Sequence, residues 1–323
     1  MSLVKGLKRA GFIEVNQPVK FTKAVQAGFV AMPWGSAWYV DGTNGDDTDT
    51  GLGPSNAKAT IQSAVTAATG GDVIYIRPLT FDDDYGFNRY TEDVEVASGI
   101  SSGTFVNAGM SLIGVTRPGA TGDFLGVRWT HETATALTNN APALALENIG
   151  FFSESATYGV HLVHDGATGT KQGSQGTSFF NCAFKGKGVY TLSGGDGLTY
   201  DSCRFQCSYG GTVAEINHSC SANPGRRLTI RNCEWLDGNG TASSGPMITI
   251  AFPCTEILIR DCHFPQKPTS SGNVYISMAG ANEGMVSNCY FGIADLDTDA
   301  EILQGTATLI VACYDVGGLA TTD

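Results

Sequence analysis

Acidic side chains that could bind a cation or act as acid–base catalysts gather at two places in the sequence. The places are a loop with Asp46, Asp47 and Asp49, and a run of three: Asp82, Asp83 and Asp84. Paired carboxylates catalyse glycoside hydrolysis, and carboxylate oxygens are ligands that Ca²⁺ prefers. Aspartate-rich turns that only face solvent are more common than either kind of site, and the first loop lacks the spacing and closing glutamate of an EF-hand. We therefore predict no catalytic residue and keep only the run of three as a weak candidate for a metal site.

The nine cysteines could in principle bind zinc, but their spacing argues against it. Zinc sites combine close pairs of cysteines, whereas the close pair Cys203 and Cys207 has no second pair to match. Five of the nine recur once per repeat, which favours reduced, buried thiols and folding in a cytoplasm. The five histidines form no Ser-His-Asp order. We expect no cofactor.

A four-residue motif explains most of these cysteines: a small polar residue, a cysteine, any residue and an aromatic ring. The cysteine and ring of its copies are Cys182 and Phe184, Cys203 and Phe205, Cys233 and Trp235, Cys262 and Phe264, and Cys289 and Phe291. An earlier copy, Asn148-Ile149-Gly150-Phe151, has Ile in the cysteine position. Ring-to-ring steps are 33, 21, 30, 29 and 27 residues, with a mean of 28. That period is typical of solenoid repeats.

The motif predicts how these side chains are positioned. Alternation along a strand puts the cysteine and the ring on the same face. Coils stacked about 4.8 Å apart then place thiol on thiol and ring on ring in buried columns. The small polar residue points the other way or lies at a bend, where it can bond to the adjacent coil. We predict a core ladder made of the five cysteines and five rings.

A second apolar strand recurs between the copies of the motif. Its members are Val160-His161-Leu162-Val163, Val189-Tyr190-Thr191-Leu192, Val213-Ala214-Glu215-Ile216, Met247-Ile248-Thr249-Ile250, Val274-Tyr275-Ile276-Ser277 and Leu309-Ile310-Val311-Ala312. Two strands per coil, separated by glycine turns, predict an all-β, single-stranded right-handed parallel β-helix. The chain has room for about nine coils over residues 72–323. A propeller blade would need about four strands per repeat.

Residues 36–71 are predicted to form a loop and a short capping helix before the first coil. Ile61, Ala64, Val65 and Ala68 form one apolar stripe. A threonine or asparagine just upstream can cap the helix, and the glycines at positions 70 and 71 can end it.

The same region carries a resemblance to a known family. It contains the runs Trp38-Tyr39-Val40-Asp41-Gly42, Gly51-Leu52-Gly53-Pro54-Ser55, Ala59-Thr60-Ile61-Gln62-Ser63-Ala64-Val65 and Gly71-Asp72-Val73-Ile74-Tyr75-Ile76. Over residues 37–78 it resembles the opening segment of pectate-lyase-like β-helix proteins, which occur on bacterial surfaces and on bacteriophage virions. The chain departs from that pattern at Pro78-Leu79-Thr80-Phe81, where relatives often have Pro-Gly-x-Tyr. The resemblance implies the β-helix fold and says little about activity.

Residues 1–35 have no clear period and mix basic residues with scattered apolar side chains. The apolar side chains are Leu3, Leu7, Phe12, Phe21, Phe29 and Trp34. One interpretation is a docking arm that orders against a partner or a neighbouring subunit. The other is a strand or loop packed on the chain's own body.

The composition limits the function. A net charge of −12 argues against nucleic acid and anionic membranes as partners, and no run of 18 apolar residues could span a bilayer. We expect a structural protein of a bacteriophage virion, made in the host cytoplasm, that decorates the capsid or forms a short tail fibre or spike. Its partners would be itself, as the homotrimer that the resemblance implies, and capsid or tail proteins bound through the arm.

Two alternatives involve a host surface glycan as the partner. One is a tailspike-like polysaccharide depolymerase, either a glycoside hydrolase or a lyase. The other is a glycan-binding module without turnover. The fold permits both, but fold alone does not imply function.

Overall fold

The computed structural model describes residues 35–79, 89–97, 100–101, 104–105, 107–115, 126–131, 134–153, 158–162, 173–192, 195–206, 215–219, 226–236, 246–251, 254–265, 275–292, 303–315 and 318–320. All of them belong to one compact unit, residues 33–323. The six apolar side chains of the predicted docking arm lie outside the described residues. So does the run of aspartates at positions 82–84.

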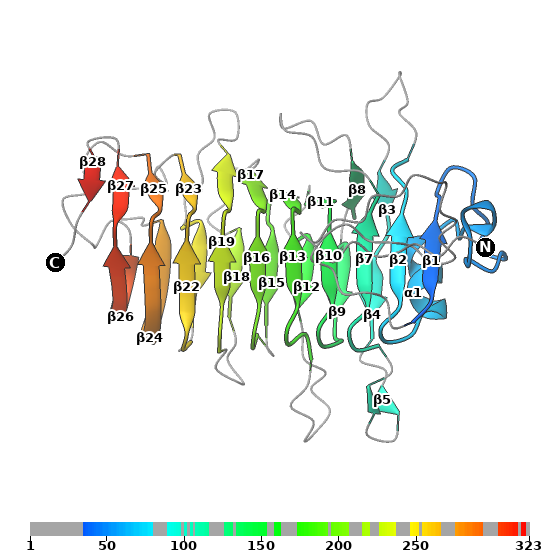
Figure 1. Cartoon of the computed structure of the whole chain (residues 1–323), viewed down its shortest axis with the longest axis horizontal. Helices are drawn as coiled ribbons and strands as arrows, with labels where there is room; N and C mark the ends of the chain where they lie inside the picture. The colour runs from blue at the N-terminus through cyan, green and yellow to red at the C-terminus, as the bar shows by residue number, and fades with distance from the viewer. Residues whose placement is uncertain are drawn as a thin grey trace, which may run out of the picture. The chain divides into compact units, whose positions relative to one another are not determined.

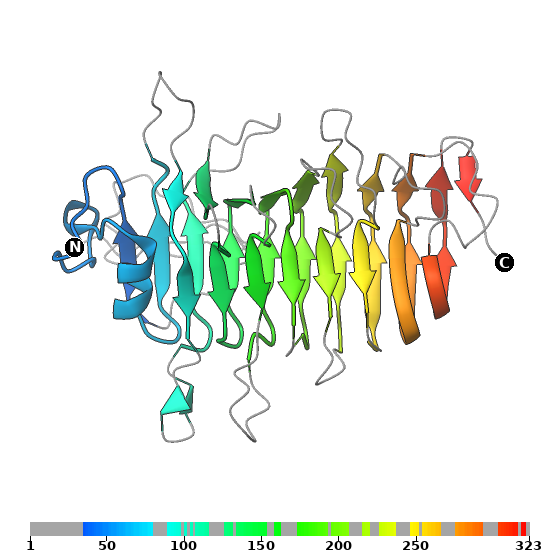
Figure 2. The same cartoon turned by 180° about the vertical axis from the view of Figure 1, so that it is seen from behind.

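Short parallel strands stack in three columns, which we name the front, upper and rear columns (Figures 1 and 2). The front column contains β1 (Ala37–Val40), β2 (Val73–Ile76), β7 (Ser111–Gly114), β10 (Ala145–Glu147), β13 (Ser178–Phe180), β16 (Thr199–Asp201), β19 (Thr229–Arg231) and β22 (Ile257–Arg260). The upper column contains β3 (Tyr90–Thr91), β8 (Val127–Thr130), β11 (Ile149–Phe152), β14 (Ala183–Lys185), β17 (Arg204–Gln206), β20 (Glu234–Leu236), β23 (His263–Phe264), β25 (Tyr290–Phe291), β27 (Cys313–Asp315) and β28 (Gly318–Ala320).

The rear column contains β4 (Val94–Val96), β9 (Leu137–Asn139), β12 (Val160–Leu162), β15 (Val189–Thr191), β18 (Ile216–His218) and β21 (Ile248–Ile250). Two long strands, β24 (Ile276–Ser287) and β26 (Leu303–Val311), run through the rear and front columns. A small antiparallel pair, β5 (Ile100–Ser101) and β6 (Thr104–Phe105), lies apart from the columns. The predicted fold class is confirmed: the chain is an all-β parallel β-helix.

Each coil has three strands, where the sequence pattern indicated two. The additional strand precedes the motif and belongs to the front column, as in β13, β16 and β19. Each of these strands buries a single central side chain, namely Phe179, Tyr200 or Ile230. A three-residue strand with one buried side chain is too short to produce a visible alternation.

Two of the strands that the sequence predicted as second strands lie elsewhere in the structure: one begins later in the chain, and the other belongs to a different column. The strand predicted at residues 213–216 begins only at Ile216, as β18. The run Leu309–Ile310–Val311 pairs with Met285, Val286 and Ser287 and so belongs to the front column. Three apolar or β-branched residues in a row fit either column, so composition alone did not separate them.

The interior holds a column of the motif thiols and a column of the motif rings. The five motif cysteines and their rings are all buried, and adjacent rings stack. Ring centroids are 4.8 Å apart between Phe205 and Trp235, 4.4 Å between Trp235 and Phe264, and 4.9 Å between Phe264 and Phe291. Cys313 continues the thiol column one coil further. Each coil therefore buries the apolar row of its neighbour, and no coil could bury its own row by itself.

The small polar residue of each motif lies at the bend between the front and upper columns. Six of these bend residues have positive φ, from 49° to 57°: Asn148, Asn181, Ser202, Asn232, Asp261 and Asn288. Ala312, just before Cys313, has a φ of 51° at the same place in the next coil. Asparagine and aspartate tolerate this left-handed conformation better than most side chains. The Asn181 amide also donates to the Asn148 side-chain oxygen at 2.6 Å, which links two coils.

We expect Asn181→Ala to lower the free energy of unfolding by about 1–2 kcal/mol, because it removes this hydrogen bond and leaves a side chain less suited to positive φ. Asn181→Gly should lose less, since glycine adopts positive φ freely. Urea unfolding of both variants measures the difference. Equal losses in the two variants would contradict a role for the backbone conformation.

The N-terminal coils carry helix α1 (Ile61–Ala67) and a short 3₁₀ helix, η1 (Pro54–Asn56). The Thr60 hydroxyl accepts from the Ser63 amide at 3.2 Å and caps α1. Glu92, from the chain between β3 and β4, accepts from the first amides of α1, Ile61 at 3.1 Å and Gln62 at 3.0 Å. Burial raises the pKa of Glu92. Among the described residues, no helix is long and apolar enough to cross a membrane.

At the C-terminal end, the chain's own tail covers part of the last coil. Strand β28 pairs antiparallel with β27, with Tyr314 opposite Leu319. This turn of the chain protects the edge of the upper column, because an uncovered strand edge would offer free backbone groups to other chains.

Candidate ligand-binding groove

The chemistry-bearing residues of the sequence analysis mostly have structural roles. Asp47 accepts hydrogen bonds from the Ala59 and Thr60 amides, both at 2.9 Å, just before α1. Asp46 accepts from the Thr48 amide at 2.8 Å within its own turn. In the part of the chain that the structure describes, no group of three or more His, Cys, Asp and Glu side chains could hold a metal ion.

The cysteines of the thiol column have a structural role and are not reactive groups. Cys203 donates to the Phe179 carbonyl at 3.4 Å, and Cys233 donates to the Arg231 carbonyl at 3.2 Å. Burial raises the pKa of Cys182 to about 12. A thiol that keeps its proton at neutral pH is neither a nucleophile nor a good metal ligand. These cysteines pack the core.

The histidines are spread over different faces. His161 lies on the rear column beside Tyr190, with ring centroids 5.0 Å apart, and burial lowers its pKa. His263 lies on the upper column, where its Nδ1 is 3.8 Å from a carboxylate oxygen of Glu234. His218 is buried inside the coils. Trp129, whose ring could otherwise stack on a sugar, is also fully buried. None of these groups forms a catalytic arrangement with another.

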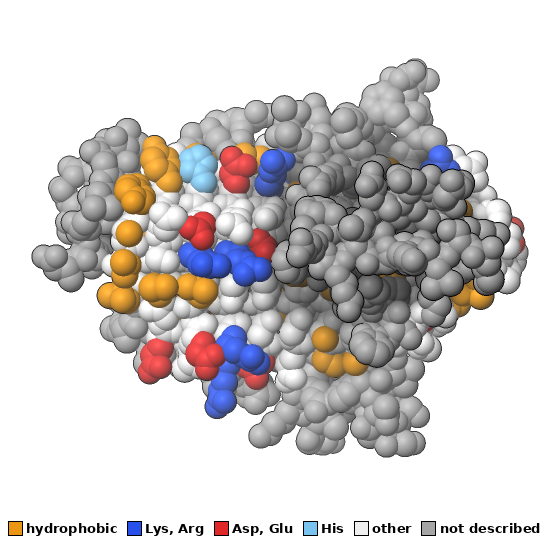
Figure 3. Space-filling model, viewed as in Figure 1, with side chains coloured by type: hydrophobic (Ala, Val, Ile, Leu, Met, Phe, Trp, Pro, Cys, Tyr) orange, Lys and Arg blue, Asp and Glu red, His pale blue; other side chains and the backbone are white. Residues whose placement is uncertain are grey.

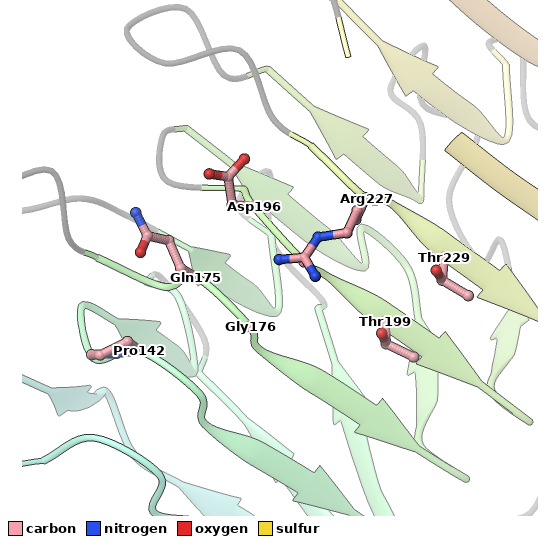
Figure 4. Close-up of a pocket in the computed structure, with 8 residues that line it drawn as sticks. Pro142, Gln175, Gly176, Asp196, Thr199, Arg227 and Thr229 are labelled. Atoms are coloured by element: carbon pink, nitrogen blue, oxygen red, sulfur yellow. The ribbon is translucent and has the colours of Figure 1, made fainter. Parts of the chain in front are cut away.

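A groove of about 600 Å³ lies along the start of the front column (Figure 4). It crosses four successive coils and is lined by Pro142, Gln175, Gly176, Asp196, Gly197, Thr199, Arg227 and Thr229. Coils stack at about 4.8 Å, so four of them span roughly 14 Å. The groove is therefore elongated along the coil axis.

A second series of left-handed bends builds the floor of this groove. Each bend lies two residues before the outward position of a front strand, with φ of 57° at Ala143, 68° at Gly176, 73° at Gly197 and 57° at Arg227. Backbone hydrogen bonds join one bend to the next, such as Gly176 N–H to the Asp196 carbonyl at 2.7 Å. These hydrogen bonds pair the backbone N–H and C=O groups of adjacent bends with one another. The side chains of the lining residues are therefore the groups that a ligand in the groove would contact.

Arg227 is the residue that most defines the groove. It occupies a left-handed position that two preceding coils fill with glycine, and its side chain is exposed. Its Nη2 lies 3.8 Å from the place that a Cβ on Gly197 would occupy, so the guanidinium reaches back over the neighbouring coil. Figure 4 shows it pointing toward Gln175 and Asp196. A non-glycine residue held at positive φ carries strain, which is common where a side chain has a function.

The remaining lining groups both donate and accept hydrogen bonds. Asp196 accepts from the Arg226 amide at 2.6 Å, which fixes its carboxylate at the rim. Thr199 and Thr229 stand in register on β16 and β19 and present hydroxyls. Asp196 is the one carboxylate among the described residues that line the groove. The arrangement can hold a polar ligand but supplies no pair of carboxylates.

Sequence reasoning did not find this groove. Gln175, Asp196 and Arg227 are separated by 21 and 31 residues and meet only because the coils stack. One feature of the sequence could have indicated the groove. The tripeptides Gly197-Leu198-Thr199 and Arg227-Leu228-Thr229 have the same order of a bend residue, a buried leucine and an outward threonine.

Comparisons with known proteins find one similar structure and no similar sequence. No protein-family model matches the chain, and no curated protein matches its sequence. Among solved structures, a mutant pectin methylesterase in complex with a hexasaccharide aligns over 91% of this chain and 92% of its own, with 13% identity and a TM-score of 0.44.

Proposed function

We propose that this β-helix binds a glycan in the groove of Gln175, Asp196 and Arg227 and does not cleave it. The observation that carries the proposal is the groove itself, an elongated surface trough whose side chains are hydroxyl, amide, carboxylate and guanidinium. A sugar hydroxyl both donates and accepts, so it suits a lining that offers both kinds of group at short spacing.

The shape and polarity of the groove favour an oligosaccharide over a small apolar ligand. Small-molecule pockets are typically enclosed and mostly apolar, whereas Pro142 is the one apolar residue, other than glycine, among the described residues of this lining. The groove runs along four coils, which matches an extended chain of polar units better than a compact molecule.

The composition of the lining also argues against turnover. Most glycoside hydrolases need two carboxylic acids flanking the bond, and this lining supplies Asp196 alone. The alternative of a depolymerase would therefore need groups outside the described residues. A reducing-sugar assay on the glycan that binds would reveal any release of oligosaccharide.

Binding is expected to depend on Arg227. We predict that Arg227→Gly weakens glycan binding at least tenfold, because it removes five N–H donors from the groove. Glycine is the residue at this bend in two neighbouring coils, so the variant should fold. A glycan array identifies the ligand, and titration calorimetry then measures the affinity.

Glu256→Gly is the matched control for this variant. Glu256 occupies the next bend of the same series, with φ of 60°, and does not line the groove. It should bind as the unmodified protein does. Absence of any bound glycan on the array, or equal affinities for both glycine variants, would contradict the proposal.

A structural role in a bacteriophage virion, with glycan binding as its attachment step, remains our proposal for the protein's setting. Its support is the resemblance of residues 37–78 and the apolar side chains of residues 1–35, expected to dock on capsid or tail proteins. Antibody labelling of particles from the corresponding phage, viewed by electron microscopy, tests it. Labelling confined to host debris would argue against a virion protein.

A further inference from the structure

The outward side chains of the front column change character between β19 and β22. In three of the four coils that form the groove they are hydroxyls, with Ser178, Thr199 and Thr229 in register, and the first of the four carries Ala145. The next three coils carry Leu258, Met285 and Leu309 at the same position. One continuous row of side chains is therefore polar over the groove and apolar toward the C-terminal end.

Leu258 and Met285 are partly exposed to solvent, and the side chains of the last coil are more exposed. Leu309 is 59% exposed, and Val311, two residues further along β26, is 39% exposed. Around the bend, Tyr290 and Tyr314 lie in register on adjacent strands of the upper column and are also exposed. Figure 3 shows the hydrophobic side chains gathered over the last strands of this face. We name Leu258, Met285, Leu309 and Val311 the C-terminal apolar surface.

Charged rows of both signs border this surface (Figure 3). On one side lie Arg231 and Arg260 with Asp201 and Asp261; Arg231 and Asp201 form an ion pair at 2.8 Å. On the other side lie the bend residue Arg227 and the acidic side chains of Glu256 and Glu283. The border has three arginines against four carboxylates, so it is nearly neutral, whereas the chain carries −12.

We propose that the C-terminal apolar surface binds the same surface of another copy of this chain. An apolar centre with a polar, charged rim is the usual anatomy of a protein interface. Two chains of charge −12 repel each other over most of their surface, so they can meet most easily where the local charge is close to zero. The apolar row runs along the coil axis, so copies placed side by side bring their rows together.

Charge also separates this occupant from others. A strongly basic partner would be drawn to the acidic remainder of the chain rather than to a nearly neutral border. A second copy instead finds both signs of charge on its own rim and can pair arginine with carboxylate across a symmetry axis. The inference does not rest on glycan binding, since none of the four apolar residues lines the groove, and Arg227 is the one named border residue that also lines it.

Sedimentation of the purified chain at about 10–50 µM tests the proposal, a range in which weak self-association becomes visible. We expect a mass that is a multiple of the chain mass, and a shift to the single-chain mass in the variant Leu309→Glu. Leu309 is mostly exposed, so a glutamate there should leave the fold intact, which circular dichroism checks. Val115→Glu, a control on an exposed valine after β7, should keep the oligomer.

Two results would overturn the proposal. One is an unmodified protein that sediments as a single chain over this range. The other is an oligomer whose mass is unchanged in Leu309→Glu and in Met285→Glu, which would place the contact elsewhere. Glycan binding by Leu309→Glu, measured alongside, should equal that of the unmodified protein.

Discussion

Trp235→Ala is expected to lower the free energy of unfolding by about 4 kcal/mol, the largest effect of a single substitution that we predict. Trp235 is 2% exposed and lies between the rings of Phe205 and Phe264. Alanine would remove a ring from the middle of the column and leave a cavity, and both neighbours would lose a stacking partner. Urea unfolding followed by circular dichroism measures the loss.

Trp235→Phe is the matched control, because both neighbours in the column are phenylalanines. The indole N–H of Trp235 is buried and has no hydrogen-bond partner. Phenylalanine would remove this unsatisfied donor, a gain that offsets the smaller ring, so we expect a change within about 1 kcal/mol. If Trp235→Phe proved as destabilising as Trp235→Ala, the stacked column would not be the source of the stability.

A second measurement tests the same columns without a substitution. The motif cysteines are buried and should react with a bulky thiol reagent only after the coils open. In Trp235→Ala, the reaction should speed up first at Cys233 and Cys262. Cys233 lies in the same coil as Trp235, and Cys262 lies in the next coil. Fast reaction of these thiols in the unmodified native protein would contradict the core ladder.

The fold could be predicted because the motif combines two periods. The spacing of two residues between Cys233 and Trp235 places both on one strand face, and the step of about 28 residues repeats that face once per coil. The small polar residue was harder to assign. Asn181 could point outward or lie at a bend, and its positive φ settles the question in favour of the bend.

The front column and its groove could not be predicted in the same way. Strand β16 buries only Tyr200, so it leaves no alternation to detect. The coils also differ in length, with 21 residues between Phe184 and Phe205 and 30 between Phe205 and Trp235. Without the register of each strand, nothing in the sequence aligns Gln175 with Asp196 and Arg227.

Lowering the pH from 6.5 to 4 is expected to reduce the free energy of unfolding through His218. This side chain is 1% exposed, and burial lowers its pKa to about 4, although the charge of Asp196 nearby favours the protonated form. An unfolded histidine has a pKa near 6.5. Between these values the unfolded chain binds the proton and the folded chain does not, so acid favours unfolding.

The contribution of His218 is fully present above pH 6.5, and about 3 kcal/mol of it should be lost by pH 4. Carboxylates also titrate near the lower end of this range, so the informative quantity is the difference between the unmodified protein and His218→Leu. The difference in free energy of unfolding, measured by urea at each pH, should change by about 3 kcal/mol in favour of the variant as the pH falls.

Thr191→Val separates the loss of a proton site from simple repacking of the same interior column. Thr191 lies in register with His218 on the preceding coil, is fully buried, and its hydroxyl oxygen has no hydrogen-bond partner. Valine has a similar shape and no titratable group, so this variant should shift the stability by one amount at every pH. The plot of unfolding free energy against pH for Thr191→Val should run parallel to that of the unmodified protein. If the plot for His218→Leu were also parallel, His218 would not be the proton site that destabilises the coils in acid.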